Sequence, residues 1–441
     1  MNDQNLMEKI VSLAKRRGFV FPGSEIYGGL AGTYDYGPYG VALKNNVNNL
    51  WWRVFVEDRD DMYGVDAAIL MNPKVWEASG HVAGFSDPLV ECEKCKRRFR
   101  ADHLEDPAVC PECGGRVSEP RQFNMMFKTR VGVTEDESAA VYLRPETAGG
   151  IFTNFKNVVD SLHPKIPFGI AQIGKAFRNE IAPRDFVFRL RELEQMEAEY
   201  FVKPGAWEQA FEEWRAAMHF FAGSIGLPQG MLHELEVPDG ERAHYSKRTI
   251  DFEFDYPFGR KELWGLAYRT DFDLSAHERG SGAELKFLDE ETKEKFTPHV
   301  IEPSLGVDRT VLALLASAYR EDELGGEARA YLALSPNVAP VKAMVAPLLR
   351  NKPELVAKAR EVRAELKKAH PAIAWDDNGN IGKRYRRQDE IGTPFCVTVD
   401  FDTLGETPEL KDTVTLRHRD TGEQERLPAA EAAERIRSVI E

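Results

Sequence analysis

The chain has 441 residues, of which 42% are hydrophobic, and a formal net charge of −14. This length predicts two or three domains with sizeable cores. No apolar run approaches the ~18 residues of a membrane-spanning helix, and residues 1–19 lack the apolar stretch of a signal peptide. We therefore predict a cytoplasmic protein with no membrane partner. The negative charge argues against general binding of nucleic acid but is compatible with a local basic face that holds RNA.

The first strong pattern along the chain is helical. Residues 40–60 place Leu43, Val47 and Leu50 on one helix face, which predicts a helix. A short strand is expected next, at 66–73, where an apolar run ends at a proline.

Four of the five cysteines lie in two closely spaced pairs at 88–120. Cys92 and Cys95 form one C-x2-C pair, and Cys110 and Cys113 form the other. This spacing is typical of zinc ribbons, in which two turns present four thiolates tetrahedrally. Two disulfides are the alternative, which a cytosolic compartment disfavours. We predict structural Zn²⁺ without a catalytic role, because four thiolates close the coordination shell.

A hairpin expected at 172–201 carries charges of both signs between aromatic and aliphatic residues. Because side chains alternate along a strand, one face is predicted to run from arginines through an apolar step to a carboxylate. At about 3.3 Å per residue this face spans roughly 26 Å, enough for ATP with a small amino acid beside its α-phosphate. A salt-bridged strand face is the alternative explanation. The residues on the predicted face are Arg189, Arg191, Leu193, Gln195 and Glu197 from one strand and Ala176, Arg178 and Glu180 from the other.

Further strands follow the hairpin. Residues 204–224 have a helical pattern, and 249–274 are expected to form strands of largely alternating pattern. Residues 297–319 indicate a strand, a glycine turn and a helix. Since strands follow one another with few helices between them, we predict an antiparallel sheet.

A linker near residue 335 is expected to separate two domains. At 338–441, strands at 342–348 and 395–401 alternate with charged helices, which favours a small α/β unit with a mixed sheet. The predicted fold class is therefore α+β. An antiparallel sheet with flanking helices at 1–335 carries the cysteine module as an insertion.

The charged hairpin resembles motif 2 of the class II aminoacyl-tRNA synthetases. The matching positions are Phe177, Arg178, Glu180, Arg189 and Glu197. Residues 297–319 resemble motif 3, in which a strand and glycine turn deliver an arginine to a helix start. Residues 40–73 resemble motif 1, the dimer-forming element.

Other stretches are similar to glycyl-tRNA synthetases of the homodimeric type, and the resemblance covers essentially the whole chain. These stretches are RPETAGGIF, EQMEAEYF, RTDFDL, VIEPS and DNGNIGKRYRRQDEIGTPF. The resemblance implies a class II catalytic domain that activates glycine with ATP and Mg²⁺, releases pyrophosphate, and transfers glycine to the 3′ end of tRNA(Gly). It also implies a homodimer formed through motif 1 and an anticodon-binding domain at 338–441.

The resemblance further implies roles for the hairpin arginines. Arg178 would hold the α-phosphate, Arg189 and Arg309 the γ-phosphate, and Glu180 the adenine amino group. Arg178, Arg309 and Glu180 are thus the catalytic candidates. One position departs from the family: Leu193 replaces the usual phenylalanine under adenine, which we expect to weaken ATP binding by about 1 kcal/mol at most. The implied ATP site comprises Arg178, Asn179, Glu180, Phe188, Arg189, Leu190, Arg191, Glu192, Leu193, Glu262, Leu263, Gly306, Val307, Asp308 and Arg309.

For the amino acid, the resemblance implies a cluster of acids around a small pocket. Glu146, Glu197 and Glu302 would bind the ammonium group, and Arg269 the carboxylate. Burying several acids is costly unless a cation is present, so stability alone would not favour this arrangement. The implied glycine site comprises Arg100, Glu146, Leu193, Glu194, Gln195, Met196, Glu197, Arg269, Glu302, Pro303, Ser304, Leu305 and Gly306.

Two basic clusters are candidates for tRNA contact. Lys383, Arg384, Arg386 and Arg387 lie in the region that resembles the anticodon-binding domain. The cysteine module is also basic, and phosphate contacts to the acceptor arm are one reading of it. A solvated basic surface is the alternative for the cysteine module.

Two alternative classes remain at this level. A non-catalytic synthetase relative that binds nucleic acid would tend to lose the phosphate-holding arginines and the substrate acids, which this chain keeps. A class II synthetase for serine, threonine or proline is the other. A P-loop ATPase is excluded, because no G-x-x-x-x-G-K-[ST] run is present.

Overall fold

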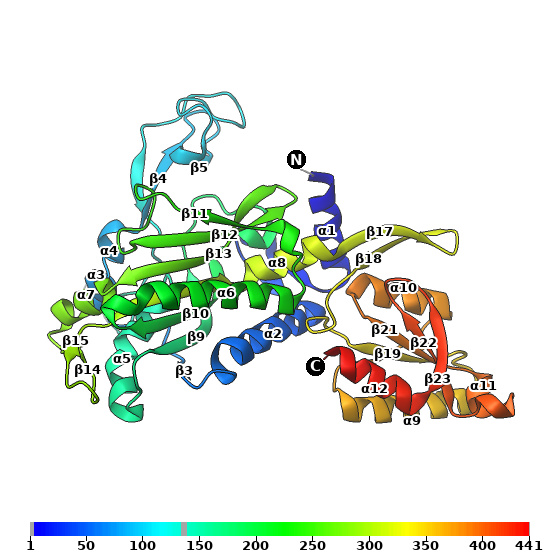
Figure 1. The fold of residues 1–441 in the computed structure, drawn as a ribbon. Helices are drawn as coiled ribbons and strands as arrows, with labels where there is room; N and C mark the ends of the chain where they lie inside the picture. The colour runs from blue at the N-terminus through cyan, green and yellow to red at the C-terminus, as the bar shows by residue number, and fades with distance from the viewer. Residues whose placement is uncertain (1–3, 134–138, 441) are drawn as a thin grey trace.

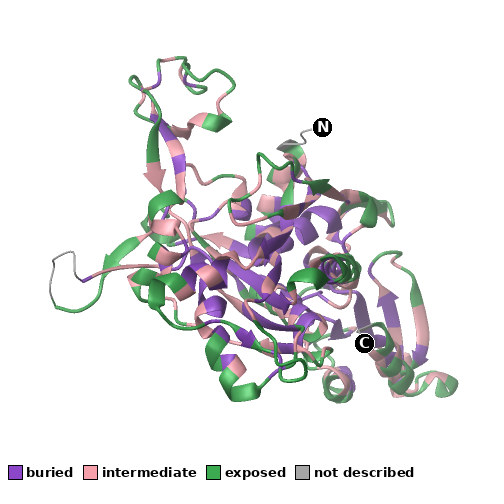
Figure 2. Ribbon diagram, turned by 60° about the vertical axis from the view of Figure 1, so that its left-hand side comes forward, coloured by how far each residue is buried: buried purple, intermediate pink, exposed green. Residues whose placement is uncertain are grey.

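Residues 4–133 and 139–440 are described by a computed structural model, in which two parts lie side by side (Figure 1). The larger part is built on a seven-stranded sheet and the smaller part on a five-stranded sheet. Buried residues follow the strands of both sheets and the inner faces of the helices (Figure 2). Within the described ranges, no helix combines the length and the apolar character needed to cross a membrane.

The seven-stranded sheet has the order β11-β12-β13-β16-β10-β9-β3. Its neighbours pair antiparallel except for β3 and β9, which are parallel. The predicted antiparallel sheet is thus confirmed. The strand bounds are Met62–Gly64 for β3, Phe168–Phe177 for β9, Glu192–Val202 for β10, Leu232–Glu236 for β11, Arg248–Tyr256 for β12, Gly259–Thr270 for β13 and His299–Gly306 for β16.

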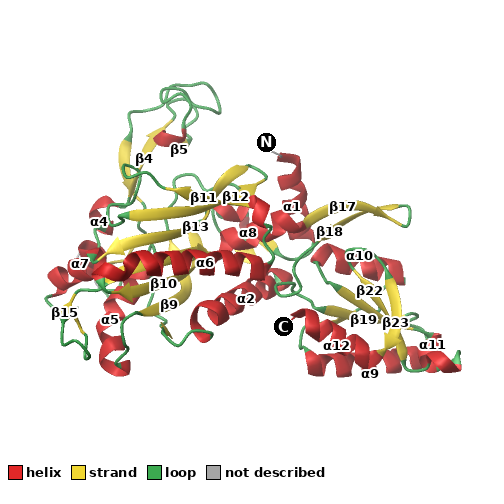
Figure 3. Ribbon diagram, viewed as in Figure 1, coloured by secondary structure: helices red, strands yellow, loops and turns green. Residues whose placement is uncertain are grey.

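Helices cover both faces of this sheet (Figure 3). Residues of α2 (Pro38–Trp52), α6 (Trp207–Ile225) and α8 (Val307–Ala318) form the main hydrophobic core with one face. Residues of α5 (Ala148–Leu162) and α7 (Phe272–Ser281) pack in a second cluster with the other face. The cores therefore hold the sheet rigid from both sides.

Strand β10 shows how alternation places the functional side chains. Its even-numbered residues Met196, Ala198 and Tyr200 belong to the main core, so Glu197 and Glu199 point to the opposite face. In the register with β9, Leu193 lies opposite Ala176 and Glu197 lies opposite Gln172. The hairpin predicted from the charge pattern is confirmed.

Two elements differ from the sequence predictions. Residues 66–73 do not form a strand, because the edge of β9 is paired with β3, and Leu70 makes an isolated bridge to Leu143 while remaining half exposed. An unpredicted hairpin, β17 (Tyr319–Leu324) and β18 (Glu327–Leu332), follows α8.

The smaller part has the order β20-β19-β21-β22-β23. Strand β19 is parallel to β20 and β21, and the remaining pairs are antiparallel, so the predicted mixed sheet is confirmed. Its elements are β19 (Ala343–Pro347), α9 (Pro353–Ala369), β20 (Ile373–Trp375), α10 (Ile381–Ile391), β21 (Phe395–Val399), α11 (Phe401–Leu404), β22 (Thr413–His418), β23 (Gln424–Pro428) and α12 (Ala429–Ile440).

The unpredicted hairpin joins the two parts. Arg329 of β18 is fully buried and pairs with Asp389 of α10 at 3.2 Å. It also donates to the carbonyl oxygen of Arg419 at 2.6 Å, and Arg419 in turn donates to that of Leu334 at 2.9 Å. These charge-assisted bonds fix the smaller part against the hairpin.

The cysteine module projects from the larger part at the top of Figure 1. It contains the three-stranded sheet β5-β4-β6, formed by β4 (Ser86–Glu91), β5 (Arg98–Arg100) and β6 (Arg121–Asn124). The other elements are α1 (Gln4–Arg16), β1 (Val20–Pro22), β2 (Tyr34–Tyr36), α3 (Pro73–Ala78), α4 (His81–Gly84), β7 (Lys128–Arg130), β8 (Ala140–Tyr142), β14 (Phe287–Leu288) and β15 (Lys295–Phe296).

Candidate active site

A cavity of about 140 Å³ lies beside β10, where the turn between β9 and β10 (residues 178–191, the motif 2 turn) meets the start of α8. Three arginines, three glutamates, one aspartate and several apolar side chains form its wall. Eleven residues of the implied ATP site are among those that line it: Arg178, Glu180, Phe188, Arg189, Leu190, Leu193, Glu262, Leu263, Gly306, Asp308 and Arg309.

The arginines of this first cavity are held by backbone carbonyls and carboxylates. Arg178 Nε donates to the carbonyl oxygen of Pro145 at 3.0 Å. Arg309 Nη1 contacts Glu262 Oε2 at 3.0 Å, and its guanidinium lies 4.5 Å from the centre of the Phe188 ring. Preorganised guanidinium groups of this kind suit the oxygens of a polyphosphate.

Glu180 supplies an acceptor at the same end. Its buried Oε2 lies 3.6 Å from Arg189 Nη1, beyond hydrogen-bond distance, and has no hydrogen-bond partner among the described residues. A buried acceptor without a donor is rare in folded proteins and calls for an explanation. An amino group of a bound ligand would satisfy it.

A second cavity of about 290 Å³ adjoins the first. The two share four lining residues, Arg178, Gln195, Glu262 and Ser304. The wall of the second adds the acids that sequence reasoning assigned to glycine, namely Glu146, Glu197 and Glu302. The structure therefore brings an arginine-rich space and a carboxylate-rich space into contact.

Glu197 is the most strongly bonded acid of the second cavity. Its Oε2 accepts the backbone N–H groups of Thr147 and Ala148, both at 3.0 Å, and the Thr147 hydroxyl. Its Oε1 accepts from Ser304 Oγ at 2.6 Å and from Gln195 Nε2 at 2.8 Å. Five donors, three of them from Thr147 and Ala148 at the start of α5, explain how this group can be buried.

Glu302 and Glu146 differ in their electrostatics. Burial raises the pKa of Glu302 to about 8, with Glu197 and Glu146 adding to the rise and Arg269 opposing it. For Glu146, burial is outweighed by His81, Arg269 and Arg178, which lower its pKa to about 2. The cavity thus concentrates carboxyl groups that a bound cation would stabilise in the charged form.

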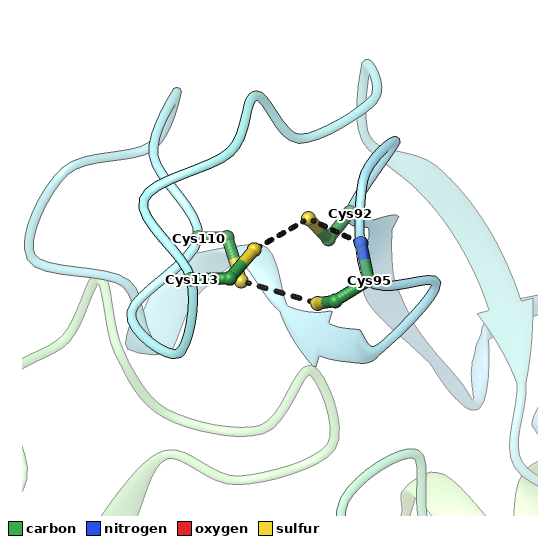
Figure 4. A group of neighbouring side chains, drawn as sticks. All are labelled: Cys92, Cys95, Cys110 and Cys113. Atoms are coloured by element: carbon green, nitrogen blue, oxygen red, sulfur yellow. Dashed lines mark hydrogen bonds between the residues drawn. The ribbon is translucent and has the colours of Figure 1, made fainter.

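The four paired cysteines meet at one point of the projecting module. Figure 4 shows their side chains directed toward one another, and all four Sγ atoms lie within 4.8 Å of one another. Cys92 Sγ is 3.5 Å from that of Cys113, and Cys95 Sγ is 3.7 Å from that of Cys110. Four thiolates bonded to Zn²⁺ at about 2.3 Å would be roughly 3.8 Å apart, so the cluster fits this metal.

The two cysteine turns have matching backbone geometry. Cys92 N–H donates to the carbonyl oxygen of Arg97 and Cys110 N–H to that of Gly115, both at 2.8 Å. The equivalent fifth residues, Lys96 and Gly114, have φ of 59° and 67°. Each turn therefore needs one left-handed residue, which directs two thiolates to the same side.

Comparisons with known proteins show which families this chain resembles. The description "tRNA synthetase class II core domain (G, H, P, S and T)" matches residues 127–318, and "Anticodon binding domain" matches residues 342–439. Glycine–tRNA ligase of Alkaliphilus oremlandii is 50% identical over 460 residues, covering 98% of each chain. The enzyme of Treponema denticola is 49% identical over 451 residues, covering 100% of this chain and 98% of its own.

The chain belongs to the glycine–tRNA ligase family. A further member, from Caldanaerobacter subterraneus, is 51% identical over 449 residues. The family predicted from the motifs is confirmed, and the alternative of a serine, threonine or proline enzyme is set aside.

Two arginines expected at the glycine site of this glycine–tRNA ligase family member have other partners. Arg269 is 1% exposed; it donates to both oxygens of Asp273 at 2.7 and 2.8 Å and to Glu302 at 2.7 Å. It therefore orients Glu302 from behind the cavity wall. Arg100 pairs with Asp87 at 2.8 Å and Asp102 at 2.7 Å, so its guanidinium is engaged within the module.

Other expected site residues take supporting positions. Glu194 faces α2, where it accepts from Asn48 at 2.9 Å and pairs with Lys44 at 2.5 Å. Arg191 donates to the carbonyl oxygen of Glu180 at 3.2 Å, and Glu192 pairs with Lys175 at 3.1 Å.

The remaining expected residues lie in or near the core. Met196, Leu305 and Val307 are fully buried in the main core. Pro303 lies opposite Leu266 within the sheet, and the Asn179 backbone N–H donates to Met125.

The basic cluster of α10 contains one buried arginine and three residues that line a cavity. Arg384 is 1% exposed and donates to the carbonyl oxygens of Asp377 and Gly379 at 3.0 and 2.7 Å, so the expectation that it contacts tRNA is wrong. Lys383, Arg386 and Arg387 line a cavity of about 760 Å³ beside the β17–β18 hairpin.

Sequence reasoning missed two residues that line the second cavity and one buried acid on the same face of β10. Asp251 of β12 lines the second cavity, and burial with Glu262 nearby raises its pKa to about 7. Tyr245 also lines it and lies 3.8 Å from the Arg269 guanidinium. Glu199 is fully buried, and within the described ranges neither of its carboxyl oxygens has a hydrogen-bond partner. The alternation along β10, which puts Glu199 on the face of Glu197, could have indicated it.

Proposed function

We propose that this protein activates glycine with ATP in the two adjoining cavities and then transfers the glycyl group to tRNA(Gly). One observation carries the proposal. The arginine-lined cavity and the carboxylate-lined cavity share Arg178, Gln195, Glu262 and Ser304, so a phosphate in one can meet an amino acid in the other.

In the first step, ATP occupies the first cavity. Arg178 holds the α-phosphate where the cavities meet, while Arg189 and Arg309 hold the γ-phosphate. Glu180 Oε2, which has no hydrogen-bond partner among the described residues, accepts from the adenine amino group. A carboxylate oxygen of glycine attacks the α-phosphorus, and the bond to pyrophosphate breaks. The protein contributes position and charge, because the substrate supplies its own nucleophile.

Glycine occupies the second cavity, with its ammonium group toward Glu146 and Glu302. Its positive charge offsets acids whose burial is otherwise unfavourable. The Ser304 and Gln195 side chains are fixed by Glu197, so they form a rigid wall beside the α-carbon. A site filled to the α-carbon excludes larger amino acids by overlap.

Mg²⁺ fits the junction of the two cavities. Asp251 and Glu262 both line the second cavity, and Mg²⁺ prefers carboxylate oxygens. When bound, the ion would supply neutralising charge for the departing pyrophosphate.

The larger assembly is part of the same proposal. The catalytic domain spans 1–335, with a zinc-ribbon insertion at 88–120, and the anticodon-binding domain spans 338–441. The basic cavity beside α10 would receive tRNA. Residues 40–73 would join two copies in a homodimer, since β3 is the edge strand of the main sheet. We propose that the reaction takes place in the cytoplasm.

Transfer of labelled glycine to tRNA(Gly) tests this function. We expect charging that requires ATP, Mg²⁺ and the intact chain, with little product from alanine or serine. Equal charging with alanine would contradict the assigned pocket, and the absence of any charging would contradict the function.

Removing one metal ligand should destabilise the projecting module. The change Cys110→Ser is expected to lower bound zinc from about one per chain to a small fraction, because a structural site needs all four ligands. Elemental analysis of the purified protein measures this, and Cys396→Ser is the matched control since Cys396 is buried in the other part of the molecule. Equal zinc contents in the two variants would refute the assignment.

The raised pKa of Glu302 predicts a pH-dependent stability. Between the unfolded pKa of about 4.3 and the folded value of about 8, the folded state binds more protons, so this group's contribution to stability is lost as pH rises. The free energy of unfolding should therefore fall more steeply from pH 5.5 to 8.5 in the wild type than in Glu302→Gln. Denaturant titrations at both pH values compare the two, and identical slopes would contradict the prediction.

A further inference from the structure

Large apolar side chains are exposed on the loop between β1 and β2. Ile26 is 89% exposed, Tyr27 87% and Leu30 61%. The loop itself is ordered by its own backbone bonds, since Tyr27 N–H and Gly29 N–H both donate to the carbonyl oxygen of Ser24, at 2.9 and 3.2 Å. Three neighbouring exposed apolar side chains on an ordered loop are typical of a surface that a partner covers.

This loop is bonded to the motif 2 turn. Arg191 N–H donates to the carbonyl oxygen of Gly32 at 2.8 Å, and Arg191 Nη1 donates to that of Ala31 at 2.9 Å. The same guanidinium donates through Nε to the carbonyl oxygen of Glu180 at 3.2 Å. Because Glu180 lines the nucleotide cavity, Arg191 links the exposed loop directly to the cavity wall.

Close packing at two further points makes this junction rigid. A Cβ on Gly32 would lie 2.7 Å from the Pro183 side chain, so no larger residue fits there without a shift. The Tyr34 ring meets the Phe186 ring edge-on, with centres 5.2 Å apart. The loop is therefore fixed relative to the motif 2 turn.

The opposite side of the motif 2 turn meets the cysteine module. Arg184 Nη2 lies 3.4 Å from His103 Nδ1, and its side chain is half exposed. The same module carries Lys94, Lys96, Arg97 and Arg98. An apolar, aromatic surface and a basic surface thus lie on two sides of the turn that walls the nucleotide cavity.

We infer that the loop at 24–31 is a stacking surface for the unpaired 3′-terminal nucleotides of the tRNA. This inference rests on the proposed function, which requires that end to reach the site of glycine activation. Unpaired bases stack on exposed aromatic side chains, while basic groups nearby neutralise the phosphates. Tyr27 supplies the aromatic face, and Ile26 and Leu30 supply the apolar surface beside it.

The change Tyr27→Ala tests the stacking surface. We expect kcat/KM for tRNA in charging to fall about tenfold, in the range of one lost base–aromatic stack. Glycine-dependent pyrophosphate exchange should stay within twofold of wild type, since that reaction uses no tRNA. Tyr27→Phe should restore charging because it keeps the ring. Phe220→Ala, at an exposed position on α6, is the matched control and should charge tRNA normally.

A binding experiment separates this inference from the proposed function. The wild type should bind intact tRNA(Gly) more tightly than tRNA trimmed of its unpaired 3′ nucleotides, and Tyr27→Ala should lose most of that preference. If the wild type shows neither glycine-dependent pyrophosphate exchange nor charging of tRNA, the proposed function fails. The binding comparison still tests the stacking surface in that case.

Three outcomes would overturn the stacking surface. Tyr27→Ala could charge tRNA like Phe220→Ala, or it could keep the full preference for intact tRNA. It could instead reduce the particle mass in light scattering, which would assign the loop to contact between two copies of the chain.

Discussion

Replacing Arg178 by alanine is expected to lower glycine-dependent pyrophosphate exchange by about 10²- to 10³-fold. Arg178 lines both cavities, at the place where the α-phosphate and the glycine carboxylate would meet. Loss of one preorganised donor at a site of developing charge costs about this much in other enzymes. Initial rates of exchange at saturating ATP and glycine measure the effect.

Two further variants separate charge from folding in this experiment. Arg178→Lys keeps the positive charge but loses the planar fork, so it should recover part of the activity. Arg437→Ala, on the remote helix α12, removes an exposed arginine that pairs with Glu434 and should exchange like wild type. Near-normal exchange by Arg178→Ala would contradict the proposal that Arg178 holds the α-phosphate.

Replacing Glu302 by glutamine should weaken glycine binding strongly while sparing the fold. The side chains are isosteric, and the amide oxygen can still accept from Arg269, which remains paired with Asp273. A lost charge-assisted bond to the ammonium group is worth about 1.5–3 kcal/mol, so KM for glycine should rise roughly 10- to 150-fold. Exchange rates against glycine concentration measure this.

The stability of the same variant gives an independent check. Burial beside Glu197 and Glu146 raises the pKa of Glu302, so folding has to keep this carboxyl group protonated at neutral pH. Glutamine carries no such cost, so the thermal midpoint at neutral pH should be unchanged or higher. Glu290→Gln, at an exposed position paired with Lys293, is the control. An unchanged KM together with a lower midpoint would mean that Glu302 has a structural role and does not bind glycine.

The sequence predicted the part of the site that lies on a strand, because side chains along a strand point alternately to its two faces. Glu197 and Leu193 face the cavities as expected, and the opposing Ala176 confirms the register. The same rule could not place Arg269, because its bonds to Asp273 of α7 depend on a helix packed against the strand end. The sequence pattern of a strand predicts which face a side chain points to. It does not predict which residue of another helix or strand that side chain will contact.

The misassigned segments have equally specific causes. Arg384 sits in a basic run, yet the Asn380 side chain caps α10 so that this arginine turns inward to the Asp377 and Gly379 carbonyls. The β17–β18 hairpin was missed because its strands are polar and mostly exposed, without the hydrophobic alternation of a half-buried sheet. Its stability comes instead from the buried Arg329, whose partners lie on both sides of the junction.

A crystal structure with a non-hydrolysable glycyl-adenylate analogue tests the central claim most directly. We expect the adenine amino group beside Glu180 Oε2 and the phosphate analogue beside Arg178. The ammonium group should lie within about 3 Å of Glu302 and Glu146, a normal hydrogen-bond distance. An analogue bound outside these two cavities, or with its ammonium group turned away from the carboxylates, would contradict it.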